Sequence, residues 1–291
     1  MSRHANPAEV ELQRAADIIS SADTLVIAAG AGIGVDSGMP DFRGNGGFWR
    51  AYPALAQAQV QFTDVACPDT FRRDPALAWG FYGHRLNLYR KVEPHRGFGL
   101  LKQWSDATPL RGWVFTSNVD GQFQKAGFDA AALYECHGSI HHLQCLDACT
   151  ADIWSADGFE PVVDEDACRL LNAPPTCAHC GGLARPNVLM FGDVDWIASR
   201  SRAQRLRQER WLDTVHQSKG SVAIIEIGAG TAIPSVRMFG HHLIREHGAR
   251  LVRINPREPA VPSARDVGLG MGAVQALEQI AARLQSARWR D

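Results

Sequence analysis

A glycine-rich segment at residues 30–44, GAGIGVDSGMPDFRG, is the part of this sequence best suited to chemistry. It directly follows the apolar stretch 24–28, and its glycines let the backbone approach a phosphate-bearing ligand closely. The triplet Asp41-Phe42-Arg43 adds an acceptor, an aromatic face and a fixed cation. A strand followed by such a loop indicates a nucleotide-binding α/β domain, and a flexible strand-to-helix turn is the alternative.

Four of the seven cysteines form two close pairs, Cys145/Cys149 and Cys177/Cys180. These spacings are typical of a tetrahedral four-thiolate zinc site. Cys168 lies between the pairs and could compete as a ligand, and a set of buried free thiols is the alternative. No residue pattern offers an open coordination position beside a base, so we expect the zinc to be structural.

Polar segments follow two further apolar stretches, TSNVDG at 116–121 and ECHGS at 135–139. Asn118 and Asp120 could be simple turn formers. His137 precedes a glycine where a strand is expected to end. An unperturbed imidazole pKa of about 6.5 suits a general base, so His137 is a catalytic candidate, with a structural histidine as the alternative.

Apolar stretches that favour strands alternate with segments of helical spacing. We expect strands at 24–28, 111–116, 131–135, 187–191, 221–227 and 250–255. This alternation predicts an α/β fold, a Rossmann-like doubly wound parallel sheet. The loops at the carboxyl ends of such strands meet at one edge, which would bring the polar segments together.

Composition narrows the functional classes. The chain has 291 residues, 45% of them hydrophobic, with 30 basic and 31 acidic residues and a formal net charge of −1. That balance gives no sign of bulk nucleic-acid affinity. We find no apolar run of membrane-spanning length and no secretory leader, and paired cysteines in such a chain favour metal over disulfides. We therefore expect a cytoplasmic protein.

Six elements, in order along residues 24–256, resemble motifs of the sirtuins, the Sir2-type NAD-dependent protein deacylases. They are GAGIGVDSGMPDFRG (30–44), TSNVDG (116–121), ECHGS (135–139), the two cysteine pairs, RPNVLMFGD (185–193) and IN (254–255). The resemblance implies a divergent, bacterial-like member of that family. It also implies a Rossmann-type NAD-binding domain at 1–44, 99–140 and 185–291, a helical insertion at 45–98 and a zinc-binding module at 141–184.

The implied reaction removes an acyl group from an acylated protein lysine. NAD is the co-substrate, and the products are nicotinamide and O-acyl-ADP-ribose. His137 and Asn118 are the implied catalytic residues. Val188, Phe191 and Gly192 would contact the acyl-lysine peptide. The implied NAD contacts are Gly30, Ala31, Gly32, Asp41, Phe42, Arg43, Ser117, Asn118, Asp120, Gly228, Gly230 and Asn255.

A tyrosine and an arginine in the helical insertion bear on the acyl group. Tyr82-Gly83-His84-Arg85 resembles the Y-x-x-R spacing of sirtuins that remove succinyl or malonyl groups, as in a desuccinylase or demalonylase, in place of the acetyl group a deacetylase removes. Arginine and a phenol can bind a carboxylate together. Two amphipathic side chains on one helix face are the alternative.

Some positions depart from the family pattern. Ser117 replaces a glutamine, Gly34 replaces a serine, and Val194-Asp195-Trp196 lacks the usual leucine-proline. These departures keep two other functions open. One is a sirtuin-like ADP-ribosyltransferase or NAD glycohydrolase, and the other is an NAD-binding sensor module.

Overall fold

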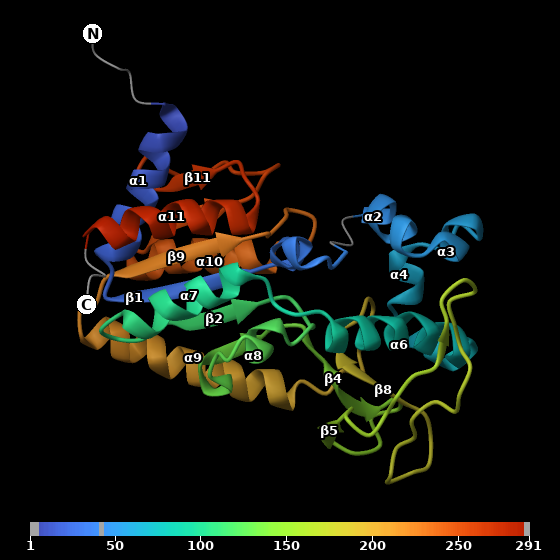
Figure 1. Ribbon diagram of the computed structural model, residues 1–291. Helices are drawn as coiled ribbons and strands as arrows, with labels where there is room; N and C mark the ends of the chain where they lie inside the picture. Colours follow the sequence, from blue (N-terminus) through green and yellow to red (C-terminus); the bar gives the residue numbers. More distant parts are fainter. Residues whose placement is uncertain (1–5, 41–43, 288–291) are drawn as a thin grey trace.

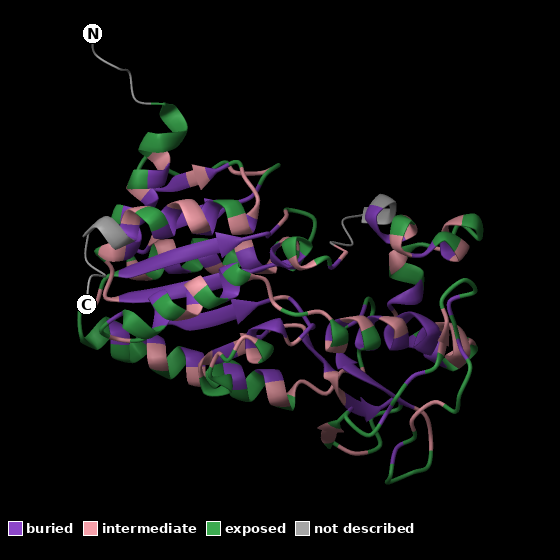
Figure 2. Ribbon diagram, in the orientation of Figure 1, coloured by how far each residue is buried: buried purple, intermediate pink, exposed green. Residues whose placement is uncertain are grey.

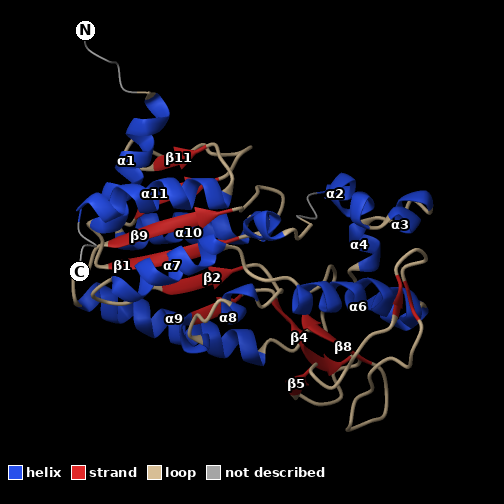
Figure 3. Ribbon diagram, viewed as in Figure 1, coloured by secondary structure: helices blue, strands red, loops and turns tan. Residues whose placement is uncertain are grey.

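The computed structural model describes residues 6–40 and 44–287, with the side chains of 44–46 and 285–287 left aside. Its larger sheet has six parallel strands in the order β11-β10-β9-β1-β2-β3 (Figures 1 and 3). The strands are β1 (Thr24–Ala29), β2 (Trp113–Thr116), β3 (Leu133–Glu135), β9 (Val222–Ile227), β10 (Arg250–Ile254) and β11 (Val267–Leu269). The predicted parallel α/β sheet is confirmed.

Helices cover both faces of this sheet. One face packs against α1 (Pro7–Ser20), α7 (Arg96–Ala107) and α11 (Ala273–Ala287). The other packs against α9 (Ser199–Gln217) and α10 (Ser235–His247). Strands covered on both faces are apolar at nearly every position, and β1 and β9 are buried along their whole length (Figure 2). The sheet therefore provides a rigid base for its loops.

The strand order reverses beside β1. From β1 the chain adds β2 and β3 on one side, then returns to add β9, β10 and β11 on the other. In doubly wound sheets a ligand binds at the carboxyl ends of the strands where the order reverses. This places the expected ligand between the loops that follow β1 and β9.

A second, antiparallel sheet has the order β5-β4-β8 and lies to the right in Figure 1. Its strands are β4 (Gly138–Cys145), β5 (Ile153–Ser155) and β8 (Ala184–Val188). The strand expected at 187–191 in the parallel sheet is thus β8, three residues earlier and in this smaller sheet. The physical reason is Gly138, whose φ of +81° turns the chain from β3 directly into β4, and β8 then pairs with β4.

Short helices fill the region expected to be a helical insertion. They are α2 (Gly44–Ala51), α3 (Pro53–Gln57), α4 (Phe62–Val65), α5 (Pro68–Arg73) and α6 (Pro75–Lys91). Their apolar side chains share a separate core with β4, β8 and the two-stranded ribbon of β6 (Val163–Asp164) and β7 (Arg169–Leu170). The predicted domain boundaries stay a prediction.

The remaining elements are α8 (Gln122–Lys125) and two 3₁₀ turns, η1 (Ala31–Ser37) and η2 (Ala130–Ala132). Within the described ranges, no helix is both long enough and apolar enough to cross a membrane.

Candidate active site

The loops after β1 and β9 touch each other through their glycines. The Gly32 amide donates to the Gly228 carbonyl at 3.1 Å. A Cβ added at Gly30 would lie 2.8 Å from that carbonyl oxygen. Gly228 has a φ of +64°, and a Cβ there would collide with the backbone of Gly32 and Ile33. Both glycines are therefore required by close backbone contact at the point where the strand order reverses.

A cavity of about 120 Å³ opens beside these loops. Gly32, Gly228, Ile254 and Gly272 are among its lining residues. A cavity walled by glycine backbone at this edge of the sheet fits the diphosphate-bearing part of a dinucleotide. A Cβ added at Gly230 would have no heavy atom within 4 Å, so that position faces open space.

The side chain of Asn255 forms hydrogen bonds with the backbone beside these loops. Its buried Nδ2 donates to the Ala229 carbonyl at 2.9 Å, and its Oδ1 accepts from the amides of Arg257 and Glu258 at 3.0 Å each. The side chain is thus engaged by backbone groups on two sides. The structure indicates that Asn255 holds the loops in place, and its direct contact with NAD stays a prediction.

His137 lies two residues after the end of β3, at the same edge of the large sheet. Its Nε2 lies 3.1 Å from Oγ of Ser235, the first residue of α10. Burial lowers the pKa of His137 below its ordinary value of 6.5, and a hydrogen bond with the Ser117 backbone acts in the opposite direction. The imidazole is therefore neutral near pH 7, as a general base must be.

Asn118 joins the turn after β2 to the first glycine loop. Its Nδ2 donates to the Gly30 carbonyl at 3.2 Å, and its amide donates to Oγ1 of Thr116 at 3.0 Å. Ser117 is held through its amide, which donates to the Ala29 carbonyl at 3.1 Å. The two predicted residues therefore lie beside the glycine loop, as expected from their place after β2.

Asp120 is buried in the same turn. Its Oδ1 accepts from the Gln122 amide at 2.9 Å. Burial raises the pKa of Asp120 to about 6, and the hydrogen bond from Gln122 opposes that shift. Asp120 also lines a second cavity, of about 290 Å³, together with Tyr89 and His141.

The four paired cysteines meet at one point. Their Sγ atoms all lie within 4.8 Å of one another, and the Cys145–Cys180 and Cys149–Cys177 distances are 3.7 Å. A zinc ion with Zn–S bonds of about 2.3 Å needs a tetrahedron with edges of about 3.8 Å. The four thiols therefore suit structural zinc.

Backbone amides favour the thiolate form of one of these ligands, Cys177. Amide hydrogen bonds from Cys180 and His179 lower the pKa of Cys177 to about 7. The Gly182 amide donates to Sγ of Cys180 at 3.4 Å. Cys168 is not part of the cluster: it is buried in the core that the short helices share with β4 and β8, which removes it as a competing ligand.

Tyr82 and Arg85 lie on α6 and are both buried. Nε and Nη2 of Arg85 donate to Oη of Tyr89 at 3.0 and 2.8 Å. The guanidinium also lies over the rings of Phe81, Tyr82 and Tyr89, at 5.3, 5.8 and 5.3 Å from their centroids. Sequence reasoning missed Tyr89, although its i,i+4 spacing from Arg85 on one helix could have indicated the pair.

The loop from Leu189 to Ile197 follows β8 and carries two of the predicted peptide contacts, Phe191 and Gly192. Phe191 is partly exposed, and its amide donates to the Ala66 carbonyl at 2.9 Å. Val188 precedes the loop and pairs with Gly138. Because Gly138 directly follows His137, the start of the loop lies next to His137.

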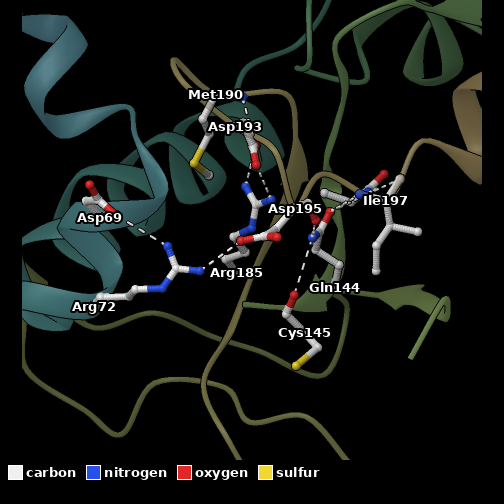
Figure 4. A network of polar contacts seen from close by, with 10 residues as sticks. Asp69, Arg72, Gln144, Cys145, Arg185, Met190, Asp193, Asp195 and Ile197 are labelled. Carbon is white, nitrogen blue, oxygen red and sulfur yellow. Dashed lines mark hydrogen bonds and ion pairs between the residues drawn. The ribbon is translucent and has the colours of Figure 1, made fainter. Parts of the chain in front are cut away.

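An ion pair fixes the middle of this loop, here called the substrate loop. Nη1 and Nη2 of Arg185 donate to the two carboxylate oxygens of Asp193 at 2.7 and 2.8 Å, and both side chains are 0% exposed (Figure 4). The Met190 amide also donates to Asp193 at 3.1 Å. A bidentate pair of this kind fixes orientation, so the loop has a defined shape.

Three predicted contacts, Asp41, Phe42 and Arg43, lie outside the described residues. Sequence reasoning also missed two residues that the fold brings to the site, Ser235 and Gln144. Ser235 could have been found from its place just after the glycine-rich segment 228–234. Gln144 carries no signal except its position beside Cys145.

A doubly wound sheet with glycine loops at its reversal point, a histidine at the same edge and a four-cysteine module define an NAD-type α/β protein with a structural metal site. The Sir2 family profile matches residues 30–210. The chain belongs to the Sir2 family, so the resemblance seen in its sequence is confirmed.

Named relatives are similar to this chain along most of their length. NAD-dependent protein deacylase 2 of Pyrobaculum aerophilum is 32% identical over 253 residues, covering 87% of this chain and 87% of that protein. NAD-dependent protein deacylase 1 of Pseudomonas aeruginosa is 33% identical over 248 residues, covering 83% of this chain and 86% of that protein.

A solved structure described as a Sir2 homolog–NAD complex has a TM-score of 0.70 and 23% identity, and covers 94% of each chain. Another, described as the structural basis of sirtuin substrate affinity, has a TM-score of 0.62 and 21% identity. These two likenesses concern the fold.

Proposed function

We propose that this chain is an NAD-dependent protein-lysine deacylase that releases nicotinamide and O-acyl-ADP-ribose. One observation carries the proposal. His137 lies at the edge of the sheet where the two glycine loops touch, with Asn118 bonded to one loop at 3.2 Å and the substrate loop paired beside it. The relatives that match most of the chain are named NAD-dependent protein deacylases, which supports the same function.

Each residue has a role that its geometry supports. Bound NAD supplies an electrophilic ribose carbon and nicotinamide as the leaving group. Asn118 and the glycine loops bind and orient the dinucleotide. His137, neutral because burial lowers its pKa, takes a proton from a hydroxyl group in the site. Ser235, 3.1 Å from Nε2, orients the imidazole ring.

We further propose that the favoured acyl group ends in a carboxylate. The support is Arg85, a buried cation whose guanidinium is held by Tyr89 and flanked by aromatic rings. An arginine guanidinium and a phenol can together bind a carboxylate through charge-assisted hydrogen bonds. Tyr82 lies three residues away on the same helix face.

The experiment incubates the pure protein with NAD, with and without succinyl-lysine and acetyl-lysine peptides, and measures nicotinamide and O-acyl-ADP-ribose. Peptide-dependent release of both products supports deacylation. Release of nicotinamide without peptide would favour the ADP-ribosyltransferase or NAD glycohydrolase alternative, which Ser117 and the divergent substrate loop keep open. NAD binding with no release would favour a sensor module and contradict the proposal.

We also propose that the protein works in the cytoplasm. Its support is chemical: four thiols that converge on one point need a reducing compartment to remain metal ligands. Cell fractionation tests this, and recovery outside the cytoplasm would contradict it.

A further inference from the structure

We propose that Gln144 is a positioning residue for the substrate loop, and that it connects this loop to the four-cysteine cluster. Gln144 lies on β4 directly before Cys145, and its side chain is completely buried. Figure 4 shows Gln144 next to Cys145 and close to Ile197, at the end of the loop. The inference rests on the proposed function in one respect: it takes the loop to be the place where the acyl-lysine peptide binds.

The amide of Gln144 uses its complete hydrogen-bonding capacity. Nε2 donates to the carbonyls of Asp195 at 2.9 Å and Cys145 at 3.3 Å. Oε1 accepts from Nδ2 of Asn187 at 2.9 Å and from the amide of Ile197 at 3.0 Å. A primary amide offers two donors and two acceptor sites, so none is left over. A buried side chain with four bonds is fixed in one orientation.

Three of those four bonds join both ends of one segment. Asn187 lies in β8 just before the loop begins, while Asp195 and Ile197 lie where it ends. Nδ2 of Asn187 also donates to the Ile197 carbonyl at 2.9 Å, which closes the loop at its base. Gln144 therefore determines the separation of the two ends, and the Arg185–Asp193 ion pair fixes the part between them.

The link to the cysteine cluster runs through the backbone. Cys145 places its Sγ 3.7 Å from that of Cys180, and its carbonyl accepts from Nε2 of Gln144. A metal that binds the thiols restrains the end of β4, and with it the position of the Gln144 amide. Loss of the metal should then loosen a loop that contains none of its ligands.

The test compares Gln144→Met with Gln208→Met. Methionine keeps much of the buried volume and removes all four hydrogen bonds. Gln208 is the matched control: it is a buried glutamine on α9, distant from the loop in sequence, and its Nε2 has no hydrogen-bond partner among the described residues. Hydrogen exchange at the amides of 189–197 and steady-state kinetics are measured for both variants.

In Gln144→Met we expect loop exchange to become at least tenfold faster and KM for the acyl peptide to rise at least tenfold, while the dissociation constant for NAD stays within twofold. Gln208→Met should change none of these. Unchanged loop exchange in a folded Gln144→Met would overturn the proposal. If this variant fails to fold, Gln144→Glu replaces it, because it keeps both acceptor contacts and loses both donors, those to Asp195 and Cys145.

Chelation tests the connection to the cluster. Zinc removal should speed loop exchange in the natural protein and add little in Gln144→Met, where the link is already broken. Equal, additive effects would refute the connection. Hydrogen exchange needs no activity, so an inactive natural protein would contradict the proposed function while the loop result still decides the role of Gln144.

Discussion

The amide of Leu189 donates a hydrogen bond to the carbonyl of His137 at 2.9 Å. The proposed base and the first residue of the substrate loop are therefore neighbours in one antiparallel pairing. Gly138 makes this possible, because a side chain at its φ of +81° would collide with the Asn187 carbonyl. The distance between the proposed base and the substrate loop is thus set by backbone hydrogen bonds, which vary less than contacts between long side chains.

Replacing the proposed base should abolish most of the activity. His137→Ala is expected to lower turnover by roughly 10²–10⁴, the usual contribution of a general base, while NAD binding stays intact. Steady-state kinetics and calorimetric NAD titration check this. Ser235→Ala, which removes only the hydroxyl that orients Nε2, should have a smaller effect. Near-normal turnover in His137→Ala would exclude this residue from the mechanism.

The pH profile should reflect the burial of His137. Because burial lowers its pKa below 6.5, the imidazole stays neutral until the pH falls below that value. We expect the acidic limb of kcat/KM to be centred below pH 6.5. Asp120, with a pKa of about 6, also titrates in that range, so the profile is repeated in Asp120→Asn. A limb centred above pH 7 in both proteins would contradict the assignment.

Asp120→Asn should make the protein more stable and less active. In the folded chain Asp120 ionises near pH 6 and in the unfolded chain near 3.8, so the folded state holds the extra proton between these values. Stability therefore falls as pH rises from about 4 to 6 and stays lower above it. The shift corresponds to up to about 3 kcal/mol at 1.36 kcal/mol per pKa unit.

The measurement is urea unfolding of both proteins. At pH 7.5 we expect Asp120→Asn to exceed the natural protein by about 1–3 kcal/mol in the free energy of unfolding. At pH 4 the difference should shrink. A variant that is less stable at both pH values would show that the ionised carboxylate stabilises the fold.

Zinc should be held tightly by the four thiols. We expect one zinc ion per chain by elemental analysis, with a binding free energy of about 10–16 kcal/mol if the site behaves like small zinc peptides. Cys177→Ser should lose the metal and disorder residues near 141–184. Cys168→Ser is the matched control and should keep it. Native protein without zinc would refute the site.

Acyl selectivity should depend on Arg85 and on Tyr89, which holds it. Charge-assisted hydrogen bonds contribute about 1.5–3 kcal/mol, so we expect at least a tenfold preference for succinyl- over acetyl-lysine. Arg85→Met should remove this preference, and Tyr89→Phe should weaken it by releasing the guanidinium. Tyr134→Phe, on β3, is the control. Equal efficiency on both peptides in the natural protein would mean that Arg85 and Tyr89 only contribute to core packing.

Sequence reasoning located the large sheet because its strands are continuous apolar runs. It placed β8 wrongly, since a short strand with buried Arg185 and Asn187 looks apolar only at some positions, and the pairing partner is decided by the turn at Gly138. It missed β11, Val267–Leu269, because three residues with a central glycine give no periodic signal.

The cysteine ligands were predictable because metal spacing is local in sequence. Gln144 was not, because a glutamine in a strand acquires its role only from tertiary neighbours. Asn255 was predicted from its motif, yet the structure engages its amide with the backbone of Ala229, Arg257 and Glu258. A motif thus identifies which residue lies at a site more reliably than it identifies the atoms that the residue contacts.

The substrate loop contains buried positions that must keep their residue and an exposed position that can accept other residues. Asp193, whose side chain is buried, and the two ends bonded to Gln144 do not tolerate substitution. Losing one partner of a buried ion pair costs about 3–5 kcal/mol of stability. Val194, between these positions, is 93% exposed. Mutations there alter the surface offered to an acceptor without unfolding the chain. Under the proposed function, acceptor choice can therefore change while the proposed base stays the same, and a library confined to Val194 and Phe191 would explore it.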